Sequence, residues 1–114
     1  MSNPKIHVTP RCPIRTTAEL IGGKWKLLIL HQLSSGPMRL TELGDAIPDI
    51  SEKMLVQELN VMVQSGLVSK QRFNEAPPRV EYAVTDKGEK IGPLLAEMAR
   101  FAAHYEREDE QSAE

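Results

Sequence analysis

The chain has 114 residues, with 14 basic and 16 acidic side chains and a formal net charge of −2. This length allows one domain with a modest core and leaves little room for the deep pocket of an enzyme. No apolar run reaches the roughly 18 residues of a membrane span, and residues 1–8 lack the apolar centre of a secretory signal, so we expect a cytoplasmic protein. The single cysteine, Cys12, agrees with a reducing compartment.

The acidic residues gather at the C-terminal end. Residues 106–114 carry five acids and one base, so the rest of the chain keeps 11 acids and 13 bases, a balance of +2. This balance is a weak signal for nucleic acid, and binding would depend on where the bases lie. We expect a flexible arm over residues 1–11, one domain over 12–105 and an acidic tail over 106–114.

Three helices are predicted in the first half of the chain. The first begins at Pro13 and ends at Gly22-Gly23, because proline suits the first turn of a helix and glycine its end. Residues 24–33 are apolar on nearly all sides, which predicts a buried helix at the centre of the core. Gly36-Pro37 ends it, and a short third helix follows with one apolar face, formed by Leu40, Leu43 and Ile47.

A fourth helix follows the break at Pro48, which disfavours helical geometry at the residue before it. Ser51 is its predicted cap and Gly66 its end. Its predicted buried face is formed by Leu55, Leu59, Met62 and Val63, and its opposite, polar face by Lys53, Gln57, Asn60 and Gln64. Such polar side chains hydrogen-bond base edges and phosphates in a major groove. Many surface helices carry a polar face, so the interpretation depends on the elements beside this one.

A hairpin is predicted next. Residues 67–73 alternate, with Lys70 and Arg72 on one face, and the returning strand alternates at Val80, Tyr82 and Val84. The loop over residues 74–79 contains two prolines, so it is stiff, and it ends in Arg79, whose guanidinium can meet phosphates or a minor groove. A proline-rich turn with solvated charges is the alternative. Because the hairpin directly follows a helix-turn-helix, the sequence predicts a winged helix, mainly α with one small hairpin.

A long final helix is predicted from Thr85, bent at Gly92-Pro93. Its apolar positions follow a three-four spacing and consist of Ile91, Leu94, Leu95, Met98, Phe101, Ala102 and Tyr105. The other elements already enclose one another, so this seam lacks an intramolecular partner and predicts a two-fold dimer contact. Dimerisation suits DNA binding, since recognition helices about 34 Å apart match successive major grooves.

Several motifs together resemble the HxlR-type transcriptional regulators, winged-helix proteins of bacteria grouped near the MarR regulators. The motifs span residues 12–105 and are Cys12-Pro13, Leu20 to Trp25, Leu28-Ile29-Leu30, Gly36-Pro37, Glu42-Leu43, Ile47-Pro48, Ile50 to Leu55, Gly66-Leu67-Val68, Pro77 to Tyr82 and Thr85 to Gly88. The resemblance implies a homodimer held by the first and last helices, with the helix from Ser51 in the major groove. It also implies that Arg79 of the wing contacts the backbone or minor groove.

The candidate DNA-contacting residues come from this resemblance and from the polar patterns. The resemblance gives Arg39, Ser51, Lys53, Met54, Gln57 and Arg79, and the patterns add Asn60, Lys70 and Arg72. The family tends to have basic residues near Asp45 and near Asn60, so this member lacks two positive charges close to the expected DNA surface. We therefore expect weaker non-specific binding.

Cys12 is the one residue with candidate chemistry. It lies beside Arg11 at the start of the first helix, where a helix dipole and a cation stabilise a thiolate. The resemblance includes relatives that sense oxidants or electrophiles through a cysteine near this place. A lone cysteine is otherwise a small buried hydrophobe, and a disulfide here would need the Cys12 of a second copy. A redox or small-molecule inducer is allowed, but no pattern defines one.

Other classes of protein have less support. The histidines His7, His31 and His104 are scattered without a catalytic motif, so we expect no enzyme and no cofactor. A metal site formed by His7, Cys12 and His104 would lack close ligand spacing. The main alternative is a winged helix that binds a protein, favoured by the acidic balance. The sequence favours a dimeric, sequence-specific DNA-binding transcriptional regulator.

Overall fold

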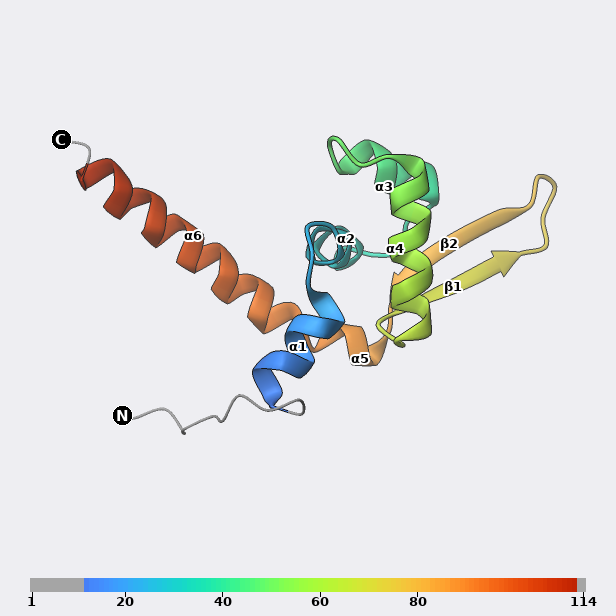
Figure 1. The fold of residues 1–114 in the computed structure, drawn as a ribbon. Coiled ribbons are helices and arrows are strands. Elements are labelled where there is room, and N and C mark those ends of the chain that lie inside the picture. Colours follow the sequence, from blue (N-terminus) through green and yellow to red (C-terminus); the bar gives the residue numbers. More distant parts are fainter. Residues whose placement is uncertain (1–11, 113–114) are drawn as a thin grey trace.

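The computed structural model describes residues 12–112, and the expected arm over residues 1–11 lies outside this range. The chain is mainly helical with one antiparallel hairpin, as predicted (Figure 1). Its elements in order are α1 (Pro13–Ile21), α2 (Lys26–Leu33), α3 (Leu40–Ala46), α4 (Glu52–Gln64), β1 (Val68–Phe73), β2 (Arg79–Val84), α5 (Asp86–Glu89) and α6 (Gly92–Ser112). None of the helices described is both long and apolar enough to cross a membrane.

The core lies where α2, α3 and α4 meet the base of the hairpin. Its buried side chains are Ile21, Ile29, Leu30, Leu33, Leu43, Ile47, Leu55, Leu59, Met62, Leu67, Val68 and Tyr82. The prediction for α2 was wrong in two respects. The helix begins at Lys26, because Gly23 (φ 94°) and Trp25 form the turn and the N-cap before it. Leu28 is 45% exposed, so one side of α2 faces away from the core.

The turn between α3 and α4 is short and well defined. Ile47 caps the C-terminal end of α3 and is itself buried in the core. Asp49 adopts a positive φ of 69°, which redirects the chain within a few residues. Ser51 then begins α4 as predicted: its Oγ accepts a hydrogen bond from the amide of Met54 at 3.1 Å. This geometry fixes α4 against α3 and forms the predicted helix-turn-helix.

Gly66 ends α4 and turns the chain into the hairpin. Its φ of 84° is left-handed, and the amide of Leu67 donates to the carbonyl of Met62 at 3.0 Å, which closes the helix end. The strands pair so that Val68 lies opposite Val84 and Phe73 opposite Arg79. Met38, just before α3, forms an isolated antiparallel bridge to Tyr82 beside the two strands of the hairpin. The sequence did not predict this bridge.

The predicted single final helix is instead two helices. Thr85 caps the four-residue α5, and α6 begins at Gly92. The carbonyl of Ile91 accepts the first hydrogen bond of α6, from Leu95 at 3.0 Å. Pro93 stands in the first turn of α6, where its missing amide costs no hydrogen bond, so it starts this helix rather than bending it. Ile91 was predicted as part of the apolar seam of this helix, but it lies before α6 and packs against the core.

The apolar residues of α6 are largely exposed. Leu94, Met98, Phe101 and Tyr105 are 37%, 42%, 70% and 62% exposed, whereas Leu95 is half-buried. In Figure 1 α6 leads away from the helical core on a different side from the hairpin. The helix continues through residues 106–112, so the described part of the expected acidic tail is helical.

Candidate nucleic-acid interface

The outer face of α4 is the first part of the candidate interface. The predicted buried residues Leu55, Leu59 and Met62 are 0–1% exposed, and Val63 is half-buried. The four polar residues predicted on the opposite face are all exposed: Lys53, Gln57, Asn60 and Gln64. Met54, also a candidate, is half-buried beside them. Because the core holds one face of α4, the other presents its polar groups at a fixed angle to solvent.

The hairpin is the second part, and it extends beyond the helices (Figure 1). Lys70 lies opposite Tyr82 and Arg72 opposite Val80 in the sheet, so the two bases share a face as predicted. Both are exposed, and the Lys70 Nζ lies 5.9 Å from the centre of the Tyr82 ring. Tyr82 is buried at the base of the hairpin, so it ties the basic face of the wing to the core.

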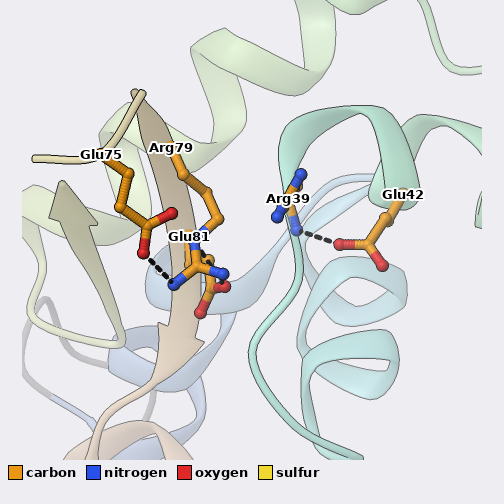
Figure 2. Close-up of polar contacts among 5 residues, drawn as sticks. All are labelled: Arg39, Glu42, Glu75, Arg79 and Glu81. Atoms are coloured by element: carbon orange, nitrogen blue, oxygen red, sulfur yellow. Dashed lines mark hydrogen bonds and ion pairs between the residues drawn. The ribbon is translucent and has the colours of Figure 1, made fainter. Parts of the chain in front are cut away.

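Arg79 differs from the prediction in position and in surroundings. It is the first residue of β2 rather than the last residue of the loop, and its side chain is only 28% exposed. Its guanidinium meets Glu75 at 3.3 Å and Glu81 at 3.4 Å, and its carbon lies 4.2 Å from the centre of the Phe73 ring (Figure 2). The guanidinium that the sequence assigns to phosphates or a minor groove is therefore engaged by two carboxylates and one aromatic ring.

Arg39 joins the interface from the turn before α3. Its neighbour Met38 bridges to Tyr82, which brings the start of α3 close to the hairpin that carries Arg79 (Figure 2). The Arg39 amide donates to a carboxylate oxygen of Glu42 at 2.8 Å, so the backbone of Arg39 caps α3 while its side chain stays exposed. The candidate bases thus come from three separate segments: the α3 turn, α4 and the hairpin.

One polar contact behind the interface was missed by sequence reasoning. Lys26 of α2 and Glu58 of α4 form an ion pair at 2.8 Å, with side chains only 15% and 17% exposed. This pair holds the recognition-helix candidate α4 to the central helix α2. No spacing rule joins residues this far apart in sequence, so only the packing of the two helices reveals the contact.

Cys12 lies at the N-cap of α1, where its Sγ accepts a hydrogen bond from the amide of Arg15 at 3.3 Å. The residue is only 5% exposed. This burial agrees with the interpretation of Cys12 as a packed side chain. Within residues 12–112 no cluster of histidine, cysteine, aspartate and glutamate could hold a metal ion; His7 of the metal hypothesis lies outside that range.

A hollow of about 450 Å³ lies away from the candidate interface, between the end of α2, the end of β2 and the beginning of α6. Its apolar walls include Leu33, Val84 and Leu95. A second hollow, of about 360 Å³, lies at the hairpin tip and is lined by Arg72, Phe73, Asn74, Pro78, Arg79 and Val80. The second hollow therefore belongs to the candidate interface, and it is bordered by two arginines.

Comparison with known proteins identifies the family. Residues 20–110 match the family described as HxlR-like helix-turn-helix. The HTH-type transcriptional regulator YkvN of Bacillus subtilis (strain 168) is 44% identical over 98 residues, which cover 86% of this chain and 83% of that protein. A crystal structure of a MarR-family regulator from Porphyromonas gingivalis W83 is 43% identical with a TM-score of 0.81, covering 85% of this chain and 95% of that one.

A third relative is the redox regulator HypR in its oxidised form, 30% identical with a TM-score of 0.77, covering 82% of this chain and 96% of that one. These relatives are transcriptional regulators, a non-enzymatic class, which confirms the prediction that the chain is not an enzyme. They do not favour the alternative of a protein-binding module. The chain belongs to the HxlR-like helix-turn-helix family and is a DNA-binding transcriptional regulator with a winged-helix fold.

Proposed function

We propose that this regulator binds a palindromic operator as a homodimer, with α4 of each copy in a major groove and the wing over residues 74–79 on the backbone or in a minor groove. The observation that carries the proposal is the division of α4 into a face buried in the core through Leu55, Leu59 and Met62 and an opposite face whose polar side chains are exposed. A helix held in this way can enter a groove without changing its own packing. Such a regulator acts where the DNA is, in the cytoplasm.

The proposed contacts divide into two kinds. Gln57 and Asn60 have amide groups that read base edges in the major groove. The bases Arg39, Lys53, Lys70, Arg72 and Arg79 contact phosphates, and Met54 packs on the backbone beside them. Ser51 uses its oxygen to accept the hydrogen bond that caps α4, which leaves its hydroxyl hydrogen free to donate to a phosphate.

The dimer is supported by the exposed apolar residues of α6 and α1. Leu94, Met98, Phe101 and Tyr105 of α6 are at least a third exposed, and so is Ile14 of α1, at 63%. Several large apolar side chains exposed along one helix mark a protein interface. A two-fold contact along α6 buries these side chains against their copies and leaves both α4 helices and both wings exposed.

Binding is tested by fluorescence anisotropy of the purified protein against fragments from upstream of its own gene, over a salt series. We expect saturable binding to one fragment, two chains per site and a steep loss of affinity with salt, because several phosphate contacts release counterions. Uniformly weak binding that depends little on salt would contradict the proposal. That result would instead favour a winged helix that binds a protein.

Two substitutions test the assignment of the grooves. Arg79→Ala should weaken binding to all sequences and reduce the salt slope by about one, as the loss of one phosphate contact requires. Gln57→Ala should relax the preference at one base pair by about 1–3 kcal/mol and leave the salt slope unchanged. If both variants bind a defined operator as the wild type does, the assignment of α4 and the wing to the grooves is wrong.

A further inference from the structure

We propose that the Glu75 carboxylate occupies the place on Arg79 that a DNA phosphate takes, while Glu81 and Phe73 hold Arg79 in the orientation that receives the phosphate. The inference rests on the proposed function, since it needs the wing to meet DNA. It assigns opposite roles to two acidic residues that lie only six positions apart. Glu75 competes with DNA, and Glu81 prepares the arginine for it.

The geometry around the guanidinium separates the two glutamates. Glu81 meets Arg79 at Nε, close to the strand backbone, whereas Glu75 meets it at the terminal nitrogen Nη2 (Figure 2). The Phe73 ring lies 4.2 Å from the guanidinium carbon. Phe73 and Arg79 are direct partners in the sheet, so the pairing register brings the ring and the guanidinium together.

The guanidinium nitrogens that the two glutamates occupy determine which glutamate a DNA phosphate must displace. Glu81 pairs with Nε and Glu75 with Nη2, and the remaining terminal nitrogen of the guanidinium is Nη1. A phosphate bound across the end of the guanidinium fork uses Nη1 and Nη2 together. Nη2 is the nitrogen that Glu75 contacts, so a phosphate bound at this end of the fork brings its negative charge next to the Glu75 carboxylate. Repulsion between the two anions then favours the departure of Glu75 when the phosphate binds. The Nε contact with Glu81 does not block that edge of the fork.

Exposure indicates which glutamate leaves. The Glu75 side chain is 52% exposed and belongs to the loop, whereas Glu81 is 24% exposed and lies within β2 opposite Gln71. An exposed ion pair is weak and screened by salt, so a phosphate from a densely charged duplex can replace it. The 360 Å³ hollow at the wing tip, lined by Arg72, Asn74 and Arg79, provides space for the incoming group.

A simpler account treats Glu75 and Glu81 as two acids that repel DNA, and it predicts a different result. Under that account, neutralising either residue raises affinity by a similar factor. Under our proposal, Glu75→Gln raises affinity and Glu81→Ala lowers it, although both substitutions remove one negative charge. The sign of the Glu81 effect therefore decides between the two accounts.

The experiment measures anisotropy on a 24-base-pair duplex of random sequence, because a phosphate contact requires no operator. We expect binding about 3–10-fold tighter for Glu75→Gln and about 3–10-fold weaker for Glu81→Ala, the size of one charged contact near a surface. Glu81→Gln should fall between Glu81→Ala and wild type, because its amide oxygen keeps a polar group beside Nε although the charge is lost. Asp45→Asn, which neutralises an exposed acid of α3, is the matched charge control.

A double-mutant cycle tests that both glutamates act through Arg79. In an Arg79→Ala background, Glu75→Gln and Glu81→Ala should each change affinity no more than Asp45→Asn does. The orientation of Arg79 is measured separately in the free protein from its ¹H–¹⁵N Nε resonance. The chemical shift of this resonance should be the same in Glu75→Gln as in wild type. In Glu81→Ala it should move toward the chemical shift of a freely rotating arginine.

Several results would overturn the inference. It fails if Glu81→Ala and Glu75→Gln raise affinity alike, or if their effects persist in the Arg79→Ala background. If Glu81→Ala does not fold, Phe73→Leu takes its place, because it removes the ring from the guanidinium and keeps an apolar side chain; it should also weaken binding. Arg79→Ala with the affinity of wild type would overturn the proposed function of the wing itself, whatever the glutamate variants show.

Discussion

Asp49 has a left-handed backbone, with a φ of 69°, in the turn that separates α3 from α4. Residues with a Cβ pay about 1–2 kcal/mol for this conformation, and Asp tolerates it better than most. We expect Asp49→Val to lower the free energy of unfolding by about 1–2 kcal/mol, because a β-branched side chain fits this conformation poorly. Urea denaturation at a fixed protein concentration measures the change.

The control for Asp49 is the same substitution at Asp45, which lies in α3 and is also exposed. Asp45→Val should change the free energy of unfolding by less than about 0.5 kcal/mol, since aspartate and valine have similar helix propensities. Asp49→Gly should be neutral or slightly stabilising, because glycine adopts a positive φ without strain. Equal losses for the two valine variants would mean that the turn does not depend on a left-handed residue.

At the scale of elements, the ion pair between Lys26 and Glu58 joins α2 to α4 on the inner side of the candidate interface. Both side chains are more than four-fifths buried, so removing one leaves the other charged and poorly solvated. We expect Glu58→Ala to destabilise the protein by about 1–3 kcal/mol. Urea denaturation provides the measurement, and DNA affinity should fall with it if α4 shifts on α2.

The double variant Lys26→Met/Glu58→Leu distinguishes the ion pair from simple loss of contacts. Replacing both charges by apolar side chains of similar length should restore most of the stability lost in Glu58→Ala. A double variant no more stable than Glu58→Ala would indicate that the pair stabilises the protein through its charges, because the double variant keeps side chains of similar length.

Local signals explain which elements the sequence predicted correctly. Pro13, Pro48 and Gly66 act on their own backbone, and each marks a helix boundary where expected. The polar face of α4 was predicted because helical periodicity alone separates Gln57 from Leu55 and Leu59. The sequence predicted one bent helix after Thr85 because Pro93 suits either a bend or a first turn. Only the packing of Ile91 on the core selects two helices.

The sequence predicted which residues of the candidate site are exposed, but it did not predict the contacts that these residues form. The exposure of Lys53, Gln57 and Arg72 follows from alternation and periodicity, which the sequence contains. The surroundings of Arg79 depend on the strand register, which pairs it with Phe73 only when the loop is counted as residues 74–78. Contacts across a hairpin therefore need a register that a proline-rich loop does not reveal.

At the scale of the whole molecule, the exposed rings of α6 determine whether the protein can read two half-sites. Phe101 and Tyr105 stack with their ring centres 6.2 Å apart and are 70% and 62% exposed. We expect Phe101→Glu to raise the dimer dissociation constant by at least about 100-fold, because a two-fold contact contains each substitution twice and buries the new charge. Sedimentation velocity over a range of protein concentrations measures this change.

Ala103→Glu is the matched control, since Ala103 is exposed and its position on α6 lies about opposite Phe101 and Tyr105. It adds the same charge to the same helix and should leave the dimer intact. A monomeric Phe101→Glu variant keeps α4 and the wing, so it should still bind a single half-site, while the tight binding of two linked half-sites is lost. If Phe101→Glu remains dimeric, the contact lies elsewhere on the chain. Because α4 and the wing lie outside this contact, their assignment to DNA would not depend on that result.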